Sequence, residues 1–553
     1  MRRLRWALAV LSLVGLPGAD PTPARAGNVL DDAAIAAFEA DLDAWDLDNA
    51  RDVLTTVRDR GARELRAAIL AFYEAKYELV ETTLASLLAS GTLDEREVPR
   101  AERFLALARG ARSSLADPIV VHSDNGRFEA VFADAKDQLL APYLFDAMEL
   151  AYRDLGADLG VRPQGPIRFE FLDAPSKLAQ ITPLSLDNIY TTGTVGVTKY
   201  QRIMMVTPRV MLYGYAWIDT AVHEYVHYLV TLRTRNRAPV WLQEGLAKLF
   251  ETRWRAAVPQ PLDPPRAALL HRALVNDDLV TLDEMQPSIA MLPSQERATL
   301  AYVEVETMLG MLLEERGEVG LTTLIDRVTD GERAEDALGV AWGTDFDDFY
   351  QRWKERMTRA TADSEGGDVE TLRFSEDGDD GVDPSLLGDV FSHLGGGKAR
   401  QHARLGVLLT LRDHKAAAAE QYEKARQASA KAARDPKLAR RLGELWLELG
   451  QAHRAAPLLD VAAKHDPRNA NLAEAQARAA LMTGQEDAAR DPADRAVQKN
   501  PFIPMLHCDL AVLATDETRR QSELAHCPLR GQLPAWMSGD PVDLRRDPAA
   551  PRR

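Results

Sequence analysis

The chain has 553 residues, of which 46% are hydrophobic and 27% charged, and its formal net charge at pH 7 is −17. This length exceeds what one hydrophobic core can serve and predicts two to four domains. The acidic excess argues against nucleic acid or an anionic membrane surface as the main partner.

Residues 1–26 have the three parts of a secretory signal peptide. A basic start at 1–5 precedes an apolar run at 6–16, and Ala24 and Ala26 form a small-x-small cleavage site. The apolar run is too short to span a bilayer, and no later run is long enough. We therefore expect a mature chain without a transmembrane segment, cleaved near Ala26 and periplasmic or secreted. An uncleaved N-terminal anchor is the alternative.

The next two segments differ in their apolar pattern. Residues 27–117 show helical periodicity throughout and predict an N-terminal helical region, either degenerate helical hairpins or a plain bundle. From residue 118 short strands appear, and the last two of them form a predicted hairpin just before the next helix. Strands are expected at 119–121, 128–131, 166–171, 194–198 and 202–206, with an amphipathic helix at 139–155.

The run His223-Glu224-Tyr225-Val226-His227 carries the chemistry of a metal site. On a helix, residues four apart lie on one face a turn apart, so the two imidazoles can share one ion. Glu224 lies beside the first histidine without occupying a ligand position. A carboxylate placed in this way can take a proton from an activated water.

A catalytic zinc ion requires a third protein ligand, and Glu244 is the natural candidate. The segment 235–239 breaks the first helix, and a second apolar helical run continues to Phe250. Glu244 lies in the first turns of that second helix, 17 residues past His227, and can fold back onto the same metal. The open fourth position is left for water.

These motifs resemble those of the gluzincin metallopeptidases, including the bacterial peptidase-MA-like domains. The likeness rests on His223-Glu224-x-x-His227 with Trp241-Leu242-x-Glu244-Gly245-Leu246-Ala247 and spans roughly residues 120–357. It implies one zinc ion per chain, bound by His223, His227 and Glu244, with Glu224 as general base. It also implies that Glu251 does not bind the metal itself but contacts one of the metal-binding side chains and orients it.

A further resemblance lies in the run that begins Ala301-Tyr302-Val303-Glu304. In the gluzincins a tyrosine of this segment steadies the tetrahedral oxyanion, which implies that role for Tyr302. The alternative is a tyrosine at the start of a buried helix whose hydroxyl bonds to the backbone. If Tyr302 is a core residue, the next candidates for the oxyanion partner are Tyr213, Tyr215 and His271.

The part of the chain after the expected catalytic domain, 118–358, divides into three. An acidic, glycine-containing stretch at 359–385 predicts a flexible linker, and a Pro- and Arg-rich tail at 528–553 predicts disorder. Between them, 386–527 resembles tetratricopeptide repeats, which stack into an α-solenoid that usually binds a protein. The small and bulky residues of one unit are Leu442, Gly443, Trp446, Gly450, Ala455, Leu459, Ala462 and Pro467, and a shift of 34 gives Ala477, Ala480, Gly484, Ala489, Ala493, Ala496 and Pro501.

The chain has two cysteines, Cys508 and Cys527. In an oxidising compartment such a pair forms a plausible disulfide, which would stabilise the fold by about 3 kcal/mol through a loop of about twenty residues. Two unpaired buried thiols are the alternative.

The sequence thus predicts an α+β protein: a gluzincin-like catalytic domain, with a small sheet and zinc-motif helices, between an N-terminal helical region and a C-terminal α-solenoid. The predicted function is a periplasmic or secreted zinc metallopeptidase acting on peptide or protein substrates. Because the Gly-x-Met-Glu-Asn stretch of aminopeptidases is absent, endopeptidase action is favoured. The alternative is a catalytically degenerate envelope scaffold that binds protein partners through its repeats.

Overall fold

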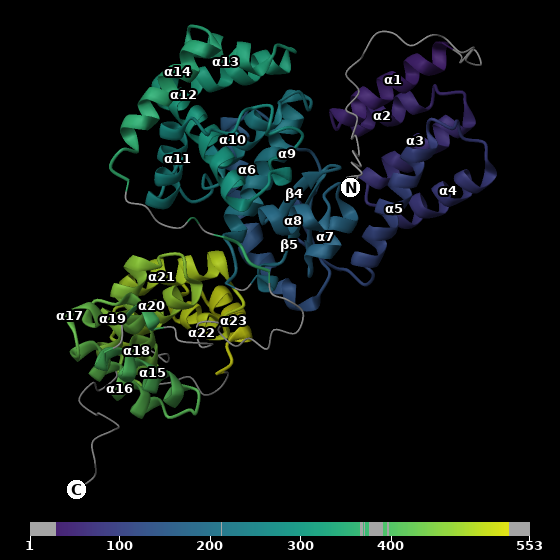
Figure 1. Cartoon of the computed structure of the whole chain (residues 1–553). Helices are drawn as coiled ribbons and strands as arrows, with labels where there is room; N and C mark the ends of the chain where they lie inside the picture. Colours follow the sequence, from purple (N-terminus) through teal and green to yellow (C-terminus); the bar gives the residue numbers. More distant parts are fainter. Residues whose placement is uncertain are drawn as a thin grey trace, which may run out of the picture.

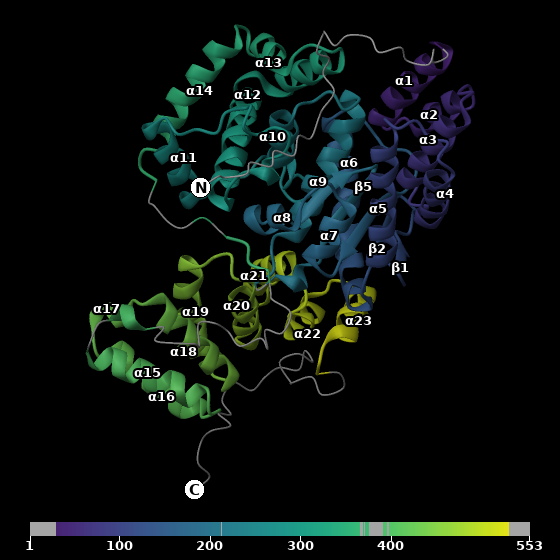
Figure 2. The same ribbon diagram turned by 45° about the vertical axis from the view of Figure 1, so that its right-hand side comes forward.

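The computed structural model describes residues 29–211, 213–364, 369, 371–374, 391–394 and 397–529. N-terminal helices, a mixed domain with a sheet and C-terminal helical hairpins follow one another along the chain (Figures 1 and 2). The predicted signal peptide at 1–26 lies outside the described residues, as do most of the predicted linker and tail. No described helix combines the length and the apolar character that a membrane crossing requires.

A five-stranded sheet forms the centre of the mixed domain, with the order β1-β2-β3-β5-β4. The three central strands run parallel, whereas β1 and β4 are antiparallel edge strands. The predicted hairpin before the motif helix is confirmed, and Tyr200 and Gln201 make its two-residue turn with positive φ. The strands are β1 (Ile119–His122), β2 (Phe128–Phe132), β3 (Ile167–Leu172), β4 (Gly196–Lys199) and β5 (Arg202–Val206).

The N-terminal helices cover one face of this sheet. Strand side chains alternate between the two faces, so Val131, Leu172 and Met204 join the core of the N-terminal helices. A buried polar contact ties the layers together, because the Tyr77 hydroxyl donates to Glu170 at 2.7 Å. These helices are α1 (Val29–Asp43), α2 (Leu47–Leu54), α3 (Arg60–Tyr73), α4 (Tyr77–Ser90) and α5 (Val98–Ser114).

The opposite face of the sheet packs against the helices that carry the motifs. Phe128, Phe169 and Met205 point into this second core, which also holds most of α9. One of these helices, α12, has a break in helical geometry at Gly317. The helices are α6 (Ala141–Asp158), α7 (Pro175–Ile181), α8 (Leu186–Thr192), α9 (Trp217–Thr234), α10 (Val240–Phe250), α11 (Pro264–Asn276), α12 (Gln295–Thr329), α13 (Ala334–Trp342) and α14 (Phe346–Ala360).

The C-terminal part consists of helices that pair as antiparallel hairpins. Small residues are needed where paired helices approach closely: a Cβ on Gly406 would lie 2.6 Å from the Tyr422 ring, and one on Gly443 would lie 2.9 Å from Leu459. The helices are α15 (Lys398–Thr410), α16 (Lys415–Gln427), α17 (Ala430–Ala433), α18 (Pro436–Glu448), α19 (Ala452–His465), α20 (Ala470–Met482), α21 (Glu486–Lys499), α22 (Pro504–Leu513) and α23 (Glu517–His526).

The hairpin of α20 and α21 docks onto the start of α9. The Trp217 indole donates to the carbonyl of Val497 at 3.0 Å, and the Tyr215 amide donates to the carbonyl of Lys499 at 3.1 Å. Gly214 permits this approach, because a Cβ there would collide with the Lys499 carbonyl. Figures 1 and 2 both place α21 and α22 directly beneath the mixed domain. Residues of α20, α21 and α22 therefore share one continuous apolar core with the mixed domain, whereas α15–α19 pack around a separate core.

A buried carboxylate fixes the final helix to α6. Glu523 accepts hydrogen bonds from the Tyr143 hydroxyl and from His507 Nδ1, each at 2.8 Å, and pairs with Arg519 at 2.9 Å. Burial raises the pKa of Glu523, but His507, Arg519 and Tyr143 together lower it below its ordinary value. Cys508 and Cys527 form a disulfide in the same region. Of the two alternatives that the sequence leaves open, a disulfide or two unpaired thiols, the structure contains the disulfide.

We expect Glu523→Ala to lower the free energy of unfolding by about 3–5 kcal/mol, because it leaves buried donors without an acceptor. Denaturant unfolding measures this, with Glu517→Ala on the exposed side of the same helix as the control. The pKa of Glu523 is lower in the folded chain than in the unfolded chain. Its contribution to the free energy of unfolding is therefore complete above the unfolded-state pKa and is lost as the pH falls through the folded-state pKa. Equal unfolding curves for the two variants would contradict this role.

Candidate metal centre

The helix α9 presents two histidines on one face, and the chain then returns in α10. His223 and His227 are four residues apart, hence about one turn. Arg235 and Asn236 adopt left-handed backbone angles, φ 52° and 57°, which end the helix and redirect the chain. Pro239 then caps α10, which carries Glu244 back toward the two histidines.

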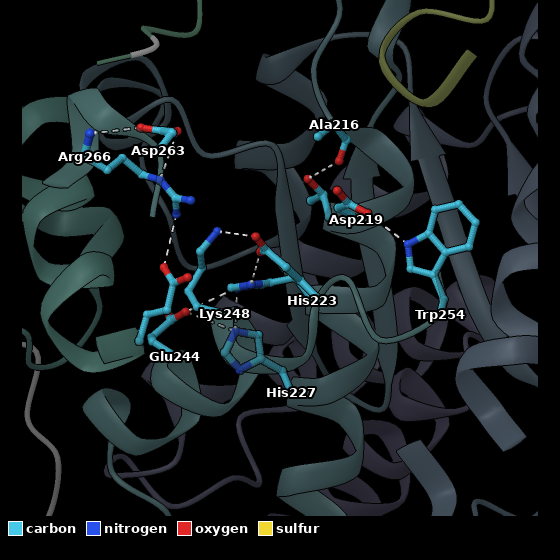
Figure 3. Close-up of polar contacts among 12 residues, drawn as sticks. Ala216, Asp219, His223, His227, Glu244, Lys248, Trp254, Asp263 and Arg266 are labelled. Atoms are coloured by element: carbon cyan, nitrogen blue, oxygen red, sulfur yellow. Dashed lines mark hydrogen bonds and ion pairs between the residues drawn. The ribbon is translucent and has the colours of Figure 1, made fainter. Parts of the chain in front are cut away.

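The three predicted ligand atoms lie together (Figure 3). His223 Nε2 and His227 Nε2 are 3.1 Å apart. Glu244 Oε2 lies 3.3 Å from the first of these nitrogens and 3.2 Å from the second. Among the described residues, this is the one group of three histidine, cysteine or acidic side chains spaced to hold a metal ion.

This triangle has the dimensions of a zinc site. Ligands bound to zinc at about 2.0–2.1 Å with tetrahedral angles are about 3.3–3.4 Å apart. Glu244 Oε2 is also buried, and it accepts no hydrogen bond of acceptable geometry within the described residues. A buried carboxylate oxygen without a donor is costly, so a cation between it and the two imidazoles satisfies what the protein leaves unpaired. The donor set therefore fits zinc.

Glu251 contacts the site from outside the triangle. Its Oε2 lies 3.3 Å from His223 Nδ1, and its Oε1 accepts from Lys248 Nζ at 2.6 Å. Burial raises the pKa of Glu251, but Lys248 and His223 outweigh this and lower it to about 2. An ionised Glu251 favours the proton on His223 Nδ1, so Nε2 keeps the lone pair that a metal requires.

The local charge is that of a cation site. Glu224, Glu244 and Glu251 supply three carboxylates around the two histidines, and Lys248 contacts Glu251. Burial lowers the pKa of His223, yet the neighbouring carboxylates of Glu244 and Glu251 raise it to about 9. Burial raises the pKa of Glu244, but His227 and His223 outweigh this effect and lower it below its ordinary value. Positive charge between these groups is therefore favoured, and a divalent ion supplies it.

Glu224 lies next to the triangle but outside it, on the side of strand β4. Its Oε2 accepts a hydrogen bond from the Thr198 hydroxyl at 2.7 Å. Its Oε1 faces Gly196, where a Cβ would lie only 2.7 Å away. The side chain of Glu224 is thus held by the edge strand of the sheet, beside the first histidine of the motif.

Tyr302 lies beside the first ligand. Its ring centroid is 6.1 Å from that of His223, in an edge-to-face arrangement. Burial first, and then the charges of Glu244 and Glu224, raise the pKa of Tyr302 well above its ordinary value. The phenol therefore keeps its proton and remains a hydrogen-bond donor.

The other candidates for the oxyanion role have different positions. Tyr215 donates its hydroxyl to the carbonyl of Val206 at 2.5 Å. His271 Nδ1 lies 3.1 Å from the Thr361 hydroxyl, and Tyr213 is 46% exposed. Of the four, Tyr302 is the one found in ring contact with a predicted ligand in the described part of the chain.

Residues not anticipated from the sequence complete the surroundings. Lys248 is four residues after Glu244, a spacing that could have placed it on the same helix face. Arg266 bonds to Glu306 at 3.1 Å and to Asp263 at 3.2 Å, as Figure 3 shows in part. Arg468, from the loop before α20, also contacts Asp263, so the repeats reach the edge of this polar network.

A comparison with protein families gives a match to this part of the chain. The family described as the Peptidase MA superfamily matches residues 147–359. No curated protein matches the sequence. Among solved structures, yeast LTA4 hydrolase in complex with bestatin is similar at 14% identity and a TM-score of 0.28, covering 76% of this chain. The chain spans 66% of that protein, less than two thirds, and at so low a TM-score the likeness bears on neither fold nor function.

The family match covers α9, α10 and the start of α12, and so includes every residue of the triangle together with Glu224, Glu251 and Tyr302. Strand β4 and the helices that close the domain, through α14, also fall within it. Residues 147–359 of this chain thus match the model of the Peptidase MA superfamily over the whole candidate metal centre.

Proposed function

We propose that this protein is a zinc-dependent metallopeptidase that hydrolyses peptide bonds at the site between α9, α10 and β4. The observation that carries the proposal is the triangle of His223 Nε2, His227 Nε2 and Glu244 Oε2, with its buried, undonated carboxylate oxygen. The family match over residues 147–359 supports the same reaction class.

In this proposal one zinc ion per chain is held by His223, His227 and Glu244. When bound, zinc acts as a Lewis acid and lowers the pKa of a water molecule toward 7. Glu224 is the general base: its carboxylate takes a proton from the attacking water and delivers it to the departing amine. The position of Glu224, next to a ligand but outside the triangle, supports this role.

Two further residues act around this step. Glu251 holds His223 in the tautomer that leaves Nε2 free, and Lys248 keeps Glu251 ionised. Tyr302 donates a hydrogen bond from its hydroxyl to the oxygen that becomes negative when water adds to the carbonyl. Its raised pKa supports donation rather than proton transfer.

We further propose endopeptidase action on an exported substrate. In aminopeptidases a Gly-x-Met-Glu-Asn stretch binds the free amino terminus of the substrate. The edge strand β4 of this chain reads Gly196-Val197-Thr198-Lys199 and contains no glutamate that could bind an amino terminus. The signal-like residues 1–26 and the disulfide between Cys508 and Cys527 support a periplasmic or secreted location. A protein partner on the repeats would bind at surfaces other than the one docked on α9.

The metal set is tested by zinc content. His223→Ala and Glu244→Ala should each lose most of one zinc per chain, because two ligands remain. Elemental analysis of the purified protein measures this, and His271→Ala, outside the triangle, is the control that keeps its zinc. Full zinc in Glu244→Ala would remove that residue from the metal set.

The general base is tested by Glu224→Gln. The amide still accepts the hydrogen bond from Thr198 and is not a ligand, so zinc and fold should be kept. Loss of a general base lowers turnover by about 10²–10⁴. Peptide hydrolysis followed by mass spectrometry gives the rate, and near-normal turnover by this variant would exclude the mechanism. A zinc-loaded wild type that cleaves no peptide would favour the scaffold alternative.

The oxyanion donor is tested by Tyr302→Phe, which keeps the ring and removes the hydroxyl. Because the charge it stabilises exists only in the transition state, kcat should fall by about 10²–10³ while KM, zinc content and Tm stay close to wild type. Tyr215→Phe is the matched control and should leave kcat in place. If Tyr302→Phe melts early with kcat intact, Tyr302 is a core residue.

A further inference from the structure

The edge strand β4 lies against the helix that carries the proposed base. Its side chains alternate, so Val197 joins the core on the N-terminal side of the sheet, while Gly196 and Thr198 face α9. Two successive positions on one face of β4 therefore meet the same residue, Glu224.

The hydroxyl of Thr198 is placed between two acceptors of Glu224. It lies 2.7 Å from the carboxylate oxygen Oε2 and 2.7 Å from the main-chain carbonyl oxygen of the same residue. A hydroxyl has one hydrogen to donate, so the two oxygens share it in a bifurcated contact that links the side chain of Glu224 to its own backbone. This contact restricts the rotation of the carboxylate about its terminal bond.

Gly196 provides the space for the other carboxylate oxygen. A Cβ at this position would lie 2.7 Å from Oε1, 3.0 Å from Cγ and 3.1 Å from Cδ of Glu224. The backbone of Gly196 is not in the left-handed region, so glycine is not required here for conformational reasons. What glycine supplies at this position is room for the carboxylate.

We propose that Thr198 and Gly196 are positioning residues that select Oε1 of Glu224 as the oxygen that moves the proton. Thr198 holds Oε2, whereas Oε1 accepts no hydrogen bond from the described residues. As water attacks the carbonyl carbon, its O–H bond breaks and an Oε1–H bond forms. The proton then passes to the amine nitrogen as the C–N bond breaks. This inference rests on the proposed function.

The hydroxyl is tested by comparing Thr198→Val with Thr198→Ser. We expect kcat to fall about 10–100-fold in the valine variant, with KM, zinc content and Tm close to wild type, and to recover in the serine variant. Thr194→Val is the matched control, because the Thr194 hydroxyl bonds to Thr192 instead. In a Glu224→Gln background, Thr198→Val should cost nothing further. A loss of equal size in both backgrounds, or no loss in the wild type, would overturn the proposal.

The space is tested by Gly196→Ala, which should displace the carboxylate because a side-chain end moves more easily than backbone. Gly397→Ala is the control, since nothing lies within 4 Å of its Cβ. The readout independent of turnover is the Kd of leucine hydroxamate for the zinc-loaded protein, because the hydroxamate donates a hydrogen bond to the base. This Kd should rise about tenfold in Thr198→Val and Gly196→Ala and stay unchanged in the controls Thr194→Val and Gly397→Ala.

These readouts separate the two proposals. If the zinc-loaded wild type cleaves no peptide, the proposed function fails, and the hydroxamate series still decides whether β4 positions Glu224. If peptides are cleaved but neither Kd nor kcat responds to Thr198→Val and Gly196→Ala, the function stands and the positioning role is wrong.

Discussion

The buried oxygen of Glu244 between two imidazoles is the constraint on which the rest of the site depends. Three ligand atoms 3.1–3.3 Å apart, with no donor on the carboxylate, form a cluster that is unfavourable without a cation. Holding it requires two helices packed rigidly against each other. The nearly full burial of α9 and the left-handed residues that end it supply that rigidity. The sheet beneath α9 then fixes the position of Glu224 through its edge strand.

The C-terminal helices contribute to the same scaffold. Carbonyls at the end of α21 accept hydrogen bonds from residues at the start of α9, and Arg468 contacts Asp263 at the start of α11. Several alanines of α20 and α21, among them Ala477 and Ala493, lie in the core shared with the mixed domain. Repeats of this kind commonly bind a separate protein. In this chain, one face of the α20–α21 hairpin is occupied by its own mixed domain.

Local spacing in the sequence was enough to predict part of this arrangement. The i, i+4 histidines, the helix break before Pro239 and the β4–β5 hairpin depend on neighbouring residues, and the structure contains all three. The choice of Glu244 came from the helix break and the position of this carboxylate in the second helix, and it agrees with the geometry. Thr198, Gly196 and the docking of Lys499 on Tyr215 were not predicted. Each depends on segments far apart in the chain, and a single sequence has no periodicity that reports such contacts.

The most direct test of the central claim is the coordination of zinc in the purified protein by X-ray absorption spectroscopy at the zinc edge. The account predicts a four-coordinate shell of two imidazole nitrogens and oxygen donors at about 2.0–2.1 Å. It also predicts that, for the zinc that His227→Ala binds at saturating zinc concentration, the imidazole scattering falls by half. A shell built from oxygen alone, or one unchanged in that variant, would contradict it.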